Sequence, residues 1–336
     1  MDLLTHVIIG YLLSYSVVGY APQYLAAGAL AGGLPDADII FFPIAKRFPI
    51  LRHHGITHSI LGVTVVALVG GLLVAPLIAP GAPWLYFAVM EIAGLGHMLS
   101  DAFTNFSVAP LLPFSERPLE IDADRAVNFI TLVASIAALV LLGSERFHVP
   151  FAVYTLTVYA LMAFYGGYFA LRLYSRWRIG RVRAAMPEYT LVSPTANPLR
   201  WLMLYERRDD GRLRTGYLQY VMGRGIVDGP HRLDVPLEDG PTPPSGPAAT
   251  AEEALERSYP LARRTSGVLD QTYHTGSVSR LPDGGWLVSY ASLEFAMFGR
   301  SAGVRVQVAP DGSLTAKGSF LSMSRRRRRP SGPTAR

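Results

Sequence analysis

The chain has 336 residues, of which half are hydrophobic and 17% are charged, and its mean hydropathy is +0.26. A typical soluble domain carries about 25% charged residues, so this composition disfavours an ordinary cytosolic enzyme. Cysteine is absent, which excludes disulfides, thiolate metal ligands and a cysteine nucleophile. The net charge is −3 for residues 1–175 and +9 for the remainder, which predicts two domains in different environments.

The first 34 residues are apolar but are interrupted at Tyr20, Ala21 and Pro22. They predict either two short spanning helices or a re-entrant hairpin, and both alternatives return the chain to the side on which it started. The first basic residue is Lys46, so we expect this segment to be retained rather than removed as a signal peptide.

Four longer apolar stretches follow, and each is close to the about 20 residues that cross the hydrocarbon of a bilayer. Buried helices of a large soluble core are the alternative, but four such stretches in succession disfavour it. Arginines concentrate in the connections that this arrangement places in the cytoplasm, as the positive-inside rule requires. We therefore predict a helical membrane domain over residues 1–183, with about six membrane segments and both termini cytoplasmic. The four longer segments are expected at residues 57–79, 84–106, 126–143 and 150–171.

For residues 184–323 we predict a small, mostly β cytoplasmic domain. Short alternating runs are joined by the sequences LPDGG and APDGS, in which Asp-Gly is typical of tight hairpin turns. A flexible Pro/Gly insertion is expected near residues 240–250, and a short helix over Ala251–Tyr259. Residues 324–336 predict a disordered tail, in which Arg325 to Arg329 would attract anionic lipid or nucleic acid, or would simply aid solubility.

Histidine and aspartate gather in the first third of the chain. In the predicted topology they all collect at the cytoplasmic face of the membrane. Ionisable residues within membrane segments are costly and are functional candidates by default. The set comprises His6, Asp36, Asp38, His53, His54, His58, His97 and Asp101.

Local spacing adds geometry to this set. His97 and Asp101 are four residues apart on a predicted helix, so both project from one face. Asp36 and Asp38 follow Pro35, where an extended backbone would direct both carboxylates the same way. In the sequence RHHGITHS, a tight turn at the glycine and an N-cap at Thr57 would place His58 in the first turn of the next helix.

Imidazole and carboxylate groups without thiolates suit a site for one to three divalent ions. Zn²⁺ is the first choice, and Mn²⁺ or Fe²⁺ are the alternatives. Each part of the pattern also has an ordinary explanation: a helical hydrogen bond for His97 and Asp101, a cap or turn for an Asp after Pro, and solvation for tandem histidines. The combination favours the metal site. We assign no role to Glu91.

Four sequence blocks, MDLLTHVIIG, LPDAD, HHGITHS and GHMLSDAFTNFSVAPLLPFS, resemble in order and spacing the YdjM family of bacterial and archaeal proteins. This family is described as inner-membrane metal-dependent hydrolases. The resemblance covers about residues 1–115, and SPTANPLRW is similar to part of the family's cytoplasmic extension. It implies that Thr5 and Thr57 neighbour the site. It also implies metal or active-site roles for His6, Asp36, Asp38, His53, His58, His97 and Asp101.

Two positions depart from the family pattern. His54 stands where the family commonly has arginine, which affects how an anionic substrate group would be bound, and Ser107 stands where glycine is usual. The His97 to Asp101 spacing also resembles, more remotely, a helix of zinc-dependent bacterial phospholipase C. This is an analogy at the level of one motif.

Two functions follow as hypotheses. The first is a hydrolase acting on a lipid-linked phosphoester at the cytoplasmic leaflet, with Asp36 or Asp101 as base and with His54 and Arg52 at the headgroup. The second is a non-enzymatic membrane protein whose metal is structural or sensory and which recruits a cytoplasmic partner. Metal transport is disfavoured, because Glu91 is the only acidic or basic residue in the four longer segments away from the inner cluster.

Overall fold

The computed structural model describes residues 1–41, 47–48, 50, 53–105, 107–143, 150–209, 212–236, 247–265, 274–292 and 300–323. Its contacts divide the chain into two units. The helical unit comprises Met1–Arg181 with Ser193–Trp201, and the β unit comprises Val182–Val192 with Leu202–Arg336. The predicted change from a helical N-terminal half to a mostly β C-terminal region is confirmed.

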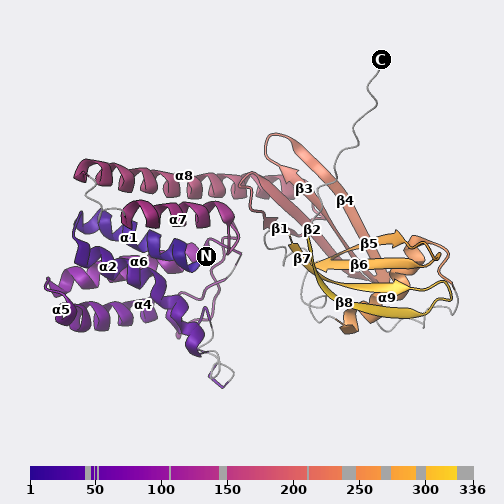
Figure 1. Cartoon of the computed structure of the whole chain (residues 1–336), viewed down its shortest axis with the longest axis horizontal. Coiled ribbons are helices and arrows are strands. Elements are labelled where there is room, and N and C mark those ends of the chain that lie inside the picture. The colour runs from indigo at the N-terminus through magenta and orange to yellow at the C-terminus, as the bar shows by residue number, and fades with distance from the viewer. Residues whose placement is uncertain are drawn as a thin grey trace, which may run out of the picture. The chain divides into compact units, whose positions relative to one another are not determined.

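The helical unit is a bundle of apolar helices. Figure 1 shows α1, α2 and α6 in its centre, with α4 and α5 on one side and with α7 and α8 on the other. Two short 3₁₀ segments, η1 and η3, lie near the end of the bundle that carries the site described below. The elements are α1 (Leu3–Val18), α2 (Pro22–Gly33), η1 (Leu34–Phe41), η3 (Ile56–His58), α4 (Ile60–Ala67), the π-helical η4 (Leu68–Val74), α5 (Ala75–Ile78), α6 (Pro83–Ala102), α7 (Phe129–Gly143) and α8 (Phe151–Ala184).

Helices that can span a membrane are fewer than the sequence predicts. Among the described residues, two helices are long and apolar enough, Ile60–Ile78 and Phe151–Ala184. Helices α1, α2 and α7 have 16, 12 and 15 residues, fewer than the about 20 that the hydrocarbon core requires. Helix α6 has 20 residues, but they include Glu91, His97 and Asp101. The prediction of six membrane segments is therefore not supported.

The apolar helices expose the kind of surface that lipid requires. Leu73, Leu77 and Ile78 point out of the bundle, and Leu139 and Val140 of α7 do the same. A soluble protein rarely presents so many large apolar side chains next to one another. The outer surface of this unit is therefore consistent with a protein whose solvent is a bilayer.

Arg172 is a core residue, although it is the first of five arginines that follow the last apolar stretch and that the positive-inside rule would place in the cytoplasm, with Arg176, Arg178, Arg181 and Arg183. Helix α8 continues through all five to Ala184. The Arg172 side chain is completely buried, pairs with Asp124, and donates to the carbonyl oxygens of Thr195 at 2.9 Å and Asn197 at 3.3 Å. A buried carboxylate needs such a partner, because breaking a buried ion pair leaves an uncompensated charge.

The C-terminal region contains two four-stranded antiparallel sheets, and in each the strands follow chain order. The helix α9 (Ala251–Thr265) packs on the second sheet through Ala254, Tyr259 and Ala262. The first sheet contains β1 (Leu191–Pro194), β2 (Arg200–Asp209), β3 (Arg212–Val221) and β4 (Gly225–Pro236). The second contains β5 (His274–Arg280), β6 (Trp286–Ser292), β7 (Arg300–Val308) and β8 (Leu314–Met323).

The predicted hairpin turns of the second sheet are confirmed. Gly284 and Gly312 both adopt a φ of +86° in the turns that join β5 to β6 and β7 to β8. Asp283 accepts a hydrogen bond from the backbone of Gly285, as an Asp-Gly turn does. The predicted short helix is found, but it extends to Thr265. Most of the predicted insertion and the whole arginine tail, residues 237–246 and 324–336, lie outside the described residues.

Candidate metal centre

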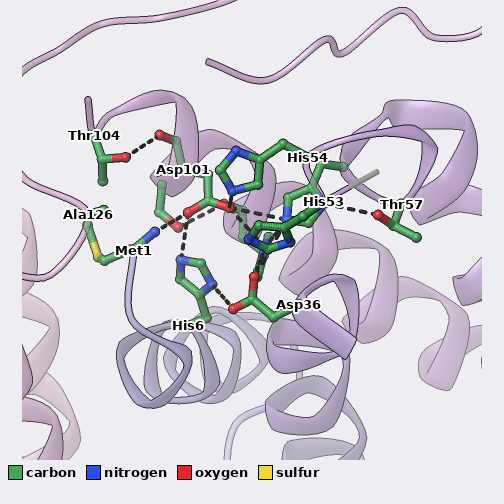
Figure 2. A network of polar contacts seen from close by, with 12 residues as sticks. Met1, His6, Asp36, His53, His54, Thr57, Asp101, Thr104 and Ala126 are labelled. Atoms are coloured by element: carbon green, nitrogen blue, oxygen red, sulfur yellow. Dashed lines mark hydrogen bonds and ion pairs between the residues drawn. The ribbon is translucent and has the colours of Figure 1, made fainter. Parts of the chain in front are cut away.

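Five of the predicted residues meet at one end of the helical bundle. His6 comes from the start of α1, Asp36 from η1, His58 from the end of η3, and His97 and Asp101 from the last turns of α6. Figure 2 shows the rings and carboxylates converging from these elements. The side chains of the three histidines and of Asp101 are at most 1% exposed, and that of Asp36 is 18% exposed.

The packing of α1 against α2 sets the position of two of these residues. A Cβ atom on Gly32 would lie 2.5 Å from the backbone oxygen of His6, so only glycine permits this approach. Gly32 also holds His97, because its carbonyl oxygen accepts a hydrogen bond of 2.7 Å from His97 Nδ1. The proton of a neutral His97 is therefore on Nδ1, and its Nε2 directs a lone pair into the cluster.

Distances within the cluster are short. Asp101 lies at its centre: Oδ2 is 3.2 Å from His97 Nε2 and 3.3 Å from His58 Nε2, and Oδ1 is 3.2 Å from His6 Nε2. The other nitrogen of His6, Nδ1, is 3.3 Å from Asp36 Oδ2. The amino group of Met1 is buried beside Asp101 Oδ1 (Figure 2). The predicted i, i+4 pairing of His97 with Asp101 on one helix face is confirmed.

Several atoms of the cluster lack hydrogen bonds. His6 Nδ1, His6 Nε2 and Asp101 Oδ2 are buried and have no hydrogen-bond partner among the described residues. Buried polar atoms are nearly always satisfied, so each exception needs an explanation. One donor atom from each of His6, Asp36, His97 and Asp101 lies within 4.8 Å of the others. These nitrogen and oxygen donors fit a divalent metal ion of the zinc, manganese or iron type.

A second group of ring nitrogens lies beside the first. His53, His54 and His58 each offer a nitrogen within 4.8 Å of the others. The His53 side chain is 47% exposed, whereas that of His54 is 15% exposed. His54 Nε2 is 3.7 Å from Asp101 Oδ2, so the two groups adjoin one another. Seven of the eight predicted residues are thus members of one group or the other.

Asp38 is the predicted residue that belongs to neither group. It is buried, and its oxygens lie 2.7 Å from His53 Nδ1, 3.3 Å from His58 Nδ1 and 2.6 Å from the hydroxyl of Thr57. It therefore lies behind the ring of His58 and leaves His58 Nε2 to face the centre. A carboxylate in this position fixes the orientation and the tautomer of a metal-binding histidine.

Two local predictions about the backbone were wrong. Asp36 and Asp38 lie on a 3₁₀ turn, not on an extended strand, and so their carboxylates face different groups. The N-cap of α4 is Ser59, whose side chain accepts from the backbone of Gly62, and not Thr57. The hydroxyl of Thr57 donates to Asp38 instead, which competes with capping.

The other implied neighbour, Thr5, is not part of the cluster. Its hydroxyl donates to Asp2, which caps α1, and lies 2.9 Å from the hydroxyl of Ser135 on α7. Thr5 therefore joins two helices beside the site. Arg52, the predicted headgroup residue, lies outside the described residues.

The electrostatics of the cluster favour a positive charge. Burial alone would lower the pKa of the His58 imidazole, but the neighbouring carboxylates of Asp101, Asp36 and Asp38 raise it to about 10. Burial would raise the pKa of the Asp36 carboxyl, but the neighbouring rings of His58 and His6 hold it well below its usual value. Burial lowers the pKa of His54 to about 4. The carboxylates thus stay ionised and attract either a proton or a metal cation.

The backbone of His54 is in an uncommon conformation. Its φ is +63°, in the left-handed region that residues with a Cβ seldom adopt. Histidine tolerates this region better than most residues, and such strain is often found at functional sites. The turn carries His54 into the wall of a neighbouring cavity.

That cavity has a volume of about 540 Å³ and lies on the exposed side of the second histidine group. His53, His54, Ser107 and Glu116 supply polar walls, and Leu112 and Pro113 are among its apolar ones. Sequence reasoning assigned no site role to Glu116 or to the Gly32 carbonyl. An isolated acid in a loop carries no motif, and a carbonyl has no side-chain signal. The small-residue run AAGALAGG around Gly32 could have indicated the close helix approach.

The apolar bundle and the His/Asp cluster at its end define a helical membrane protein with a candidate metal centre. A family profile described as YdjM inner membrane protein matches residues 1–178. The chain therefore belongs to this family of inner membrane proteins, which confirms the resemblance seen in its four sequence blocks. No curated protein and no solved structure matches the chain.

Proposed function

We propose that this protein is a membrane-bound, metal-dependent hydrolase of a lipid-linked phosphoester at the cytoplasmic leaflet. One observation carries the proposal: the buried nitrogens of His6 and the Oδ2 atom of Asp101 have no hydrogen-bond partner among the described residues. A divalent cation would satisfy these atoms together. The two groups together also offer more donors than the four that a closed structural zinc site uses, which leaves room for an open coordination position.

His6, Asp36, His97 and Asp101 would hold the ion, and His58 would complete or bridge the group. Zn²⁺ is the metal that we propose first, with Mn²⁺ or Fe²⁺ as alternatives, because all the donors are nitrogen and oxygen atoms. When bound, such an ion supplies a water of near-neutral pKa and polarises the phosphoryl oxygens. Asp38 and Gly32 act as positioning groups, since they fix the rings of His58 and His97.

Asp36 is the carboxylate best placed to handle protons. Its side chain is 18% exposed, whereas that of Asp101 is 1% exposed. In the proposed reaction a water oxygen bonds to phosphorus and the bond from phosphorus to the leaving alcohol oxygen breaks. The proton of the water passes to the alcohol, and the oxygen of Asp36 that does not bind the ion would relay it. His54 lies where the cluster meets the cavity and would orient the phosphoryl group.

The lipid-linked nature of the substrate is inferred from location. The cavity beside the cluster has both polar and apolar walls, as an amphiphilic ligand requires. The family is one of inner membrane proteins. A water-soluble substrate would gain little from an enzyme that resides in a membrane.

The test is metal content by mass spectrometry on protein purified in detergent with metal supplied. We expect stoichiometric metal in the wild type and its loss in His97→Ala and Asp101→Asn. The control is Glu91→Gln, which changes a carboxylate of the same helix that accepts from Thr64, away from the cluster. Metal-loaded protein should then release phosphate or a phosphorylated headgroup from phospholipid vesicles. A folded wild type without metal would refute the proposal.

A structural or sensory metal is the second candidate, and burial favours it. His6, His97 and Asp101 are at most 1% exposed, as ligands of a closed site are. In that case the protein would recruit a cytoplasmic partner and would not hydrolyse lipids. The two functions differ in metal exchange: an open catalytic ion should exchange with a chelator while the protein stays folded, and a closed structural ion should leave only on unfolding.

A further inference from the structure

The cavity beside the cluster is bordered by a loop whose apolar side chains point outward. This loop, Ala109–Pro118, follows α6 and supplies Leu112 and Pro113 to the cavity wall. Phe114 is 85% exposed and Leu111 is 52% exposed. A phenylalanine left in water forfeits the free energy that burial of its ring would contribute. An exposed pair of this kind therefore calls for a covering surface.

The loop is held in a defined shape by its own backbone. Val108 and Leu119 exchange two hydrogen bonds, of 3.1 and 2.7 Å, across its base. The amide of Phe114 donates to the carbonyl oxygen of Leu111 at 2.8 Å, which closes the turn at its tip. These bonds define the path of the loop backbone, along which Leu111 and Phe114 are exposed.

The loop also lies beside the first residue of a candidate membrane span. The amide of Ile60, the first residue of the candidate span Ile60–Ile78, donates to the carbonyl oxygen of Pro110 at 2.9 Å. Ile60 and Leu61 are themselves exposed. The apolar surface of the span is thus continuous with the base of the loop, and a bilayer that covers one reaches the other.

We propose that the loop Ala109–Pro118 inserts Leu111 and Phe114 into the lipid surface, so that the cavity opens at the headgroup layer. The ligand class that fits is an amphiphilic lipid, with its polar head at His54 and its apolar part along Leu112. The surrounding helices, their inner-membrane family and the continuity with the span favour lipid over a protein partner. The insertion stands by itself, whereas cleavage of the bound lipid rests on the proposed function.

The experiment exploits the absence of cysteine, which makes a single introduced cysteine the only labelling site. A nitroxide at Phe114→Cys is compared in phospholipid nanodiscs with labels at three other exposed positions. Leu73→Cys, on the span, is the lipid reference. Arg117→Cys, in the same loop, is the matched polar control, and Asp311→Cys, in a turn of the second sheet, is the water reference. Collision with oxygen, which enriches in lipid, is measured against collision with a water-soluble nickel chelate.

The ratio of oxygen to nickel collisions at position 114 should approach that at Leu73 and exceed that at Arg117 several-fold. A ratio at position 114 equal to that at Asp311 would overturn the proposal. Shielding from both reagents would also overturn it, because it would indicate a second copy or another protein over the loop. The readout needs neither metal nor turnover, so its failure is distinguishable from failure of the hydrolase proposal. All four positions are exposed, so the labels need no repacking of the core.

Discussion

The orientation of each histidine ring in the centre is set by the group that contacts its other nitrogen. The Gly32 carbonyl orients His97, and the Asp38 carboxylate orients His58. Both contacts are on Nδ1, so both rings offer Nε2 to the cluster, where these two atoms are 3.0 Å apart. Without a metal ion, a proton on His58 joins the two atoms in a hydrogen bond, and a divalent cation would take the place of that proton. Gly32 and Asp38, which orient the rings, therefore matter to metal binding as the ligands do.

Asp38→Asn tests whether this carboxylate orients His58 for metal binding. An amide at this position can donate to His58 Nδ1, which would move the ring proton to Nε2 and take away its lone pair. We expect the affinity for Zn²⁺ to fall by about 10–100-fold while the protein stays folded. Titration against a competing chelator measures the change. Glu91→Gln serves as the control, and an unchanged affinity in Asp38→Asn would refute the positioning role.

At this scale the sequence predicts side-chain chemistry better than geometry. Imidazoles and carboxylates are conspicuous in an apolar chain, so His6, His97 and Asp101 could be identified before the structure. The turn at Asp36 and Asp38 could not be predicted, because a Pro-Asp sequence suits several backbone conformations. The two carboxylates consequently face different partners, and only the structure separates them.

The elements that build the site are held together by small residues. Helices α1 and α2 touch at Gly10, Gly28 and Gly32, where an added Cβ would meet backbone or side-chain atoms within 2.5 Å. In lipid, helix association relies on close packing and not on the hydrophobic effect, so such contacts carry much of the stability. The same contact sets the separation of His6 and His97, because Gly32 approaches the backbone of one and binds the ring of the other.

Gly32→Ala should therefore damage the centre without touching a ligand. The new methyl group would push α1 away from α2 and shift both rings, so we expect the metal content to fall well below stoichiometric. The matched control is Gly167→Ala on α8, where an added Cβ would meet nothing within 4 Å among the described residues. Mass spectrometry of the two variants, purified in parallel, gives the comparison. Equal metal content in both would show that the helix approach does not position the centre.

Composition was sufficient to predict the fold class of the whole molecule, and was insufficient to count the spans. The apolar runs in the first half and the alternating strands in the second are unambiguous. Apolar helices of 12 to 16 residues, however, can pack inside a bundle without crossing a bilayer. Hydropathy measures the transfer of a segment from water to an apolar environment, so it does not distinguish a helix packed inside a bundle from one that crosses the bilayer. The burial of Arg172 could not be predicted for a different reason: its partner Asp124 is distant in sequence, and no local pattern pairs the two.

Metal removal should destabilise one unit and spare the other. A ligand that binds only the folded state adds stability, about 2.7 kcal/mol when its free concentration is 100 times its dissociation constant. We expect a chelator to lower the melting temperature of the helical unit in calorimetry, and added Zn²⁺ to restore it. The transition of the β unit is an internal control. Asp101→Asn should melt at one temperature with or without chelator, and a chelator effect in that variant would contradict a metal site at Asp101.

The centre draws its residues from α1, η1, η3 and α6, so no short stretch of the chain contains it. A ribosome must therefore complete α6 before His97 and Asp101 exist, and α6 must then pack back against α1. A metal ion that uses these side chains would be captured only after α6 is made, although α7, α8 and the β unit follow later in the chain. Bound metal would then report that α1 and α6 are correctly paired, and chains in which they are not would remain without metal.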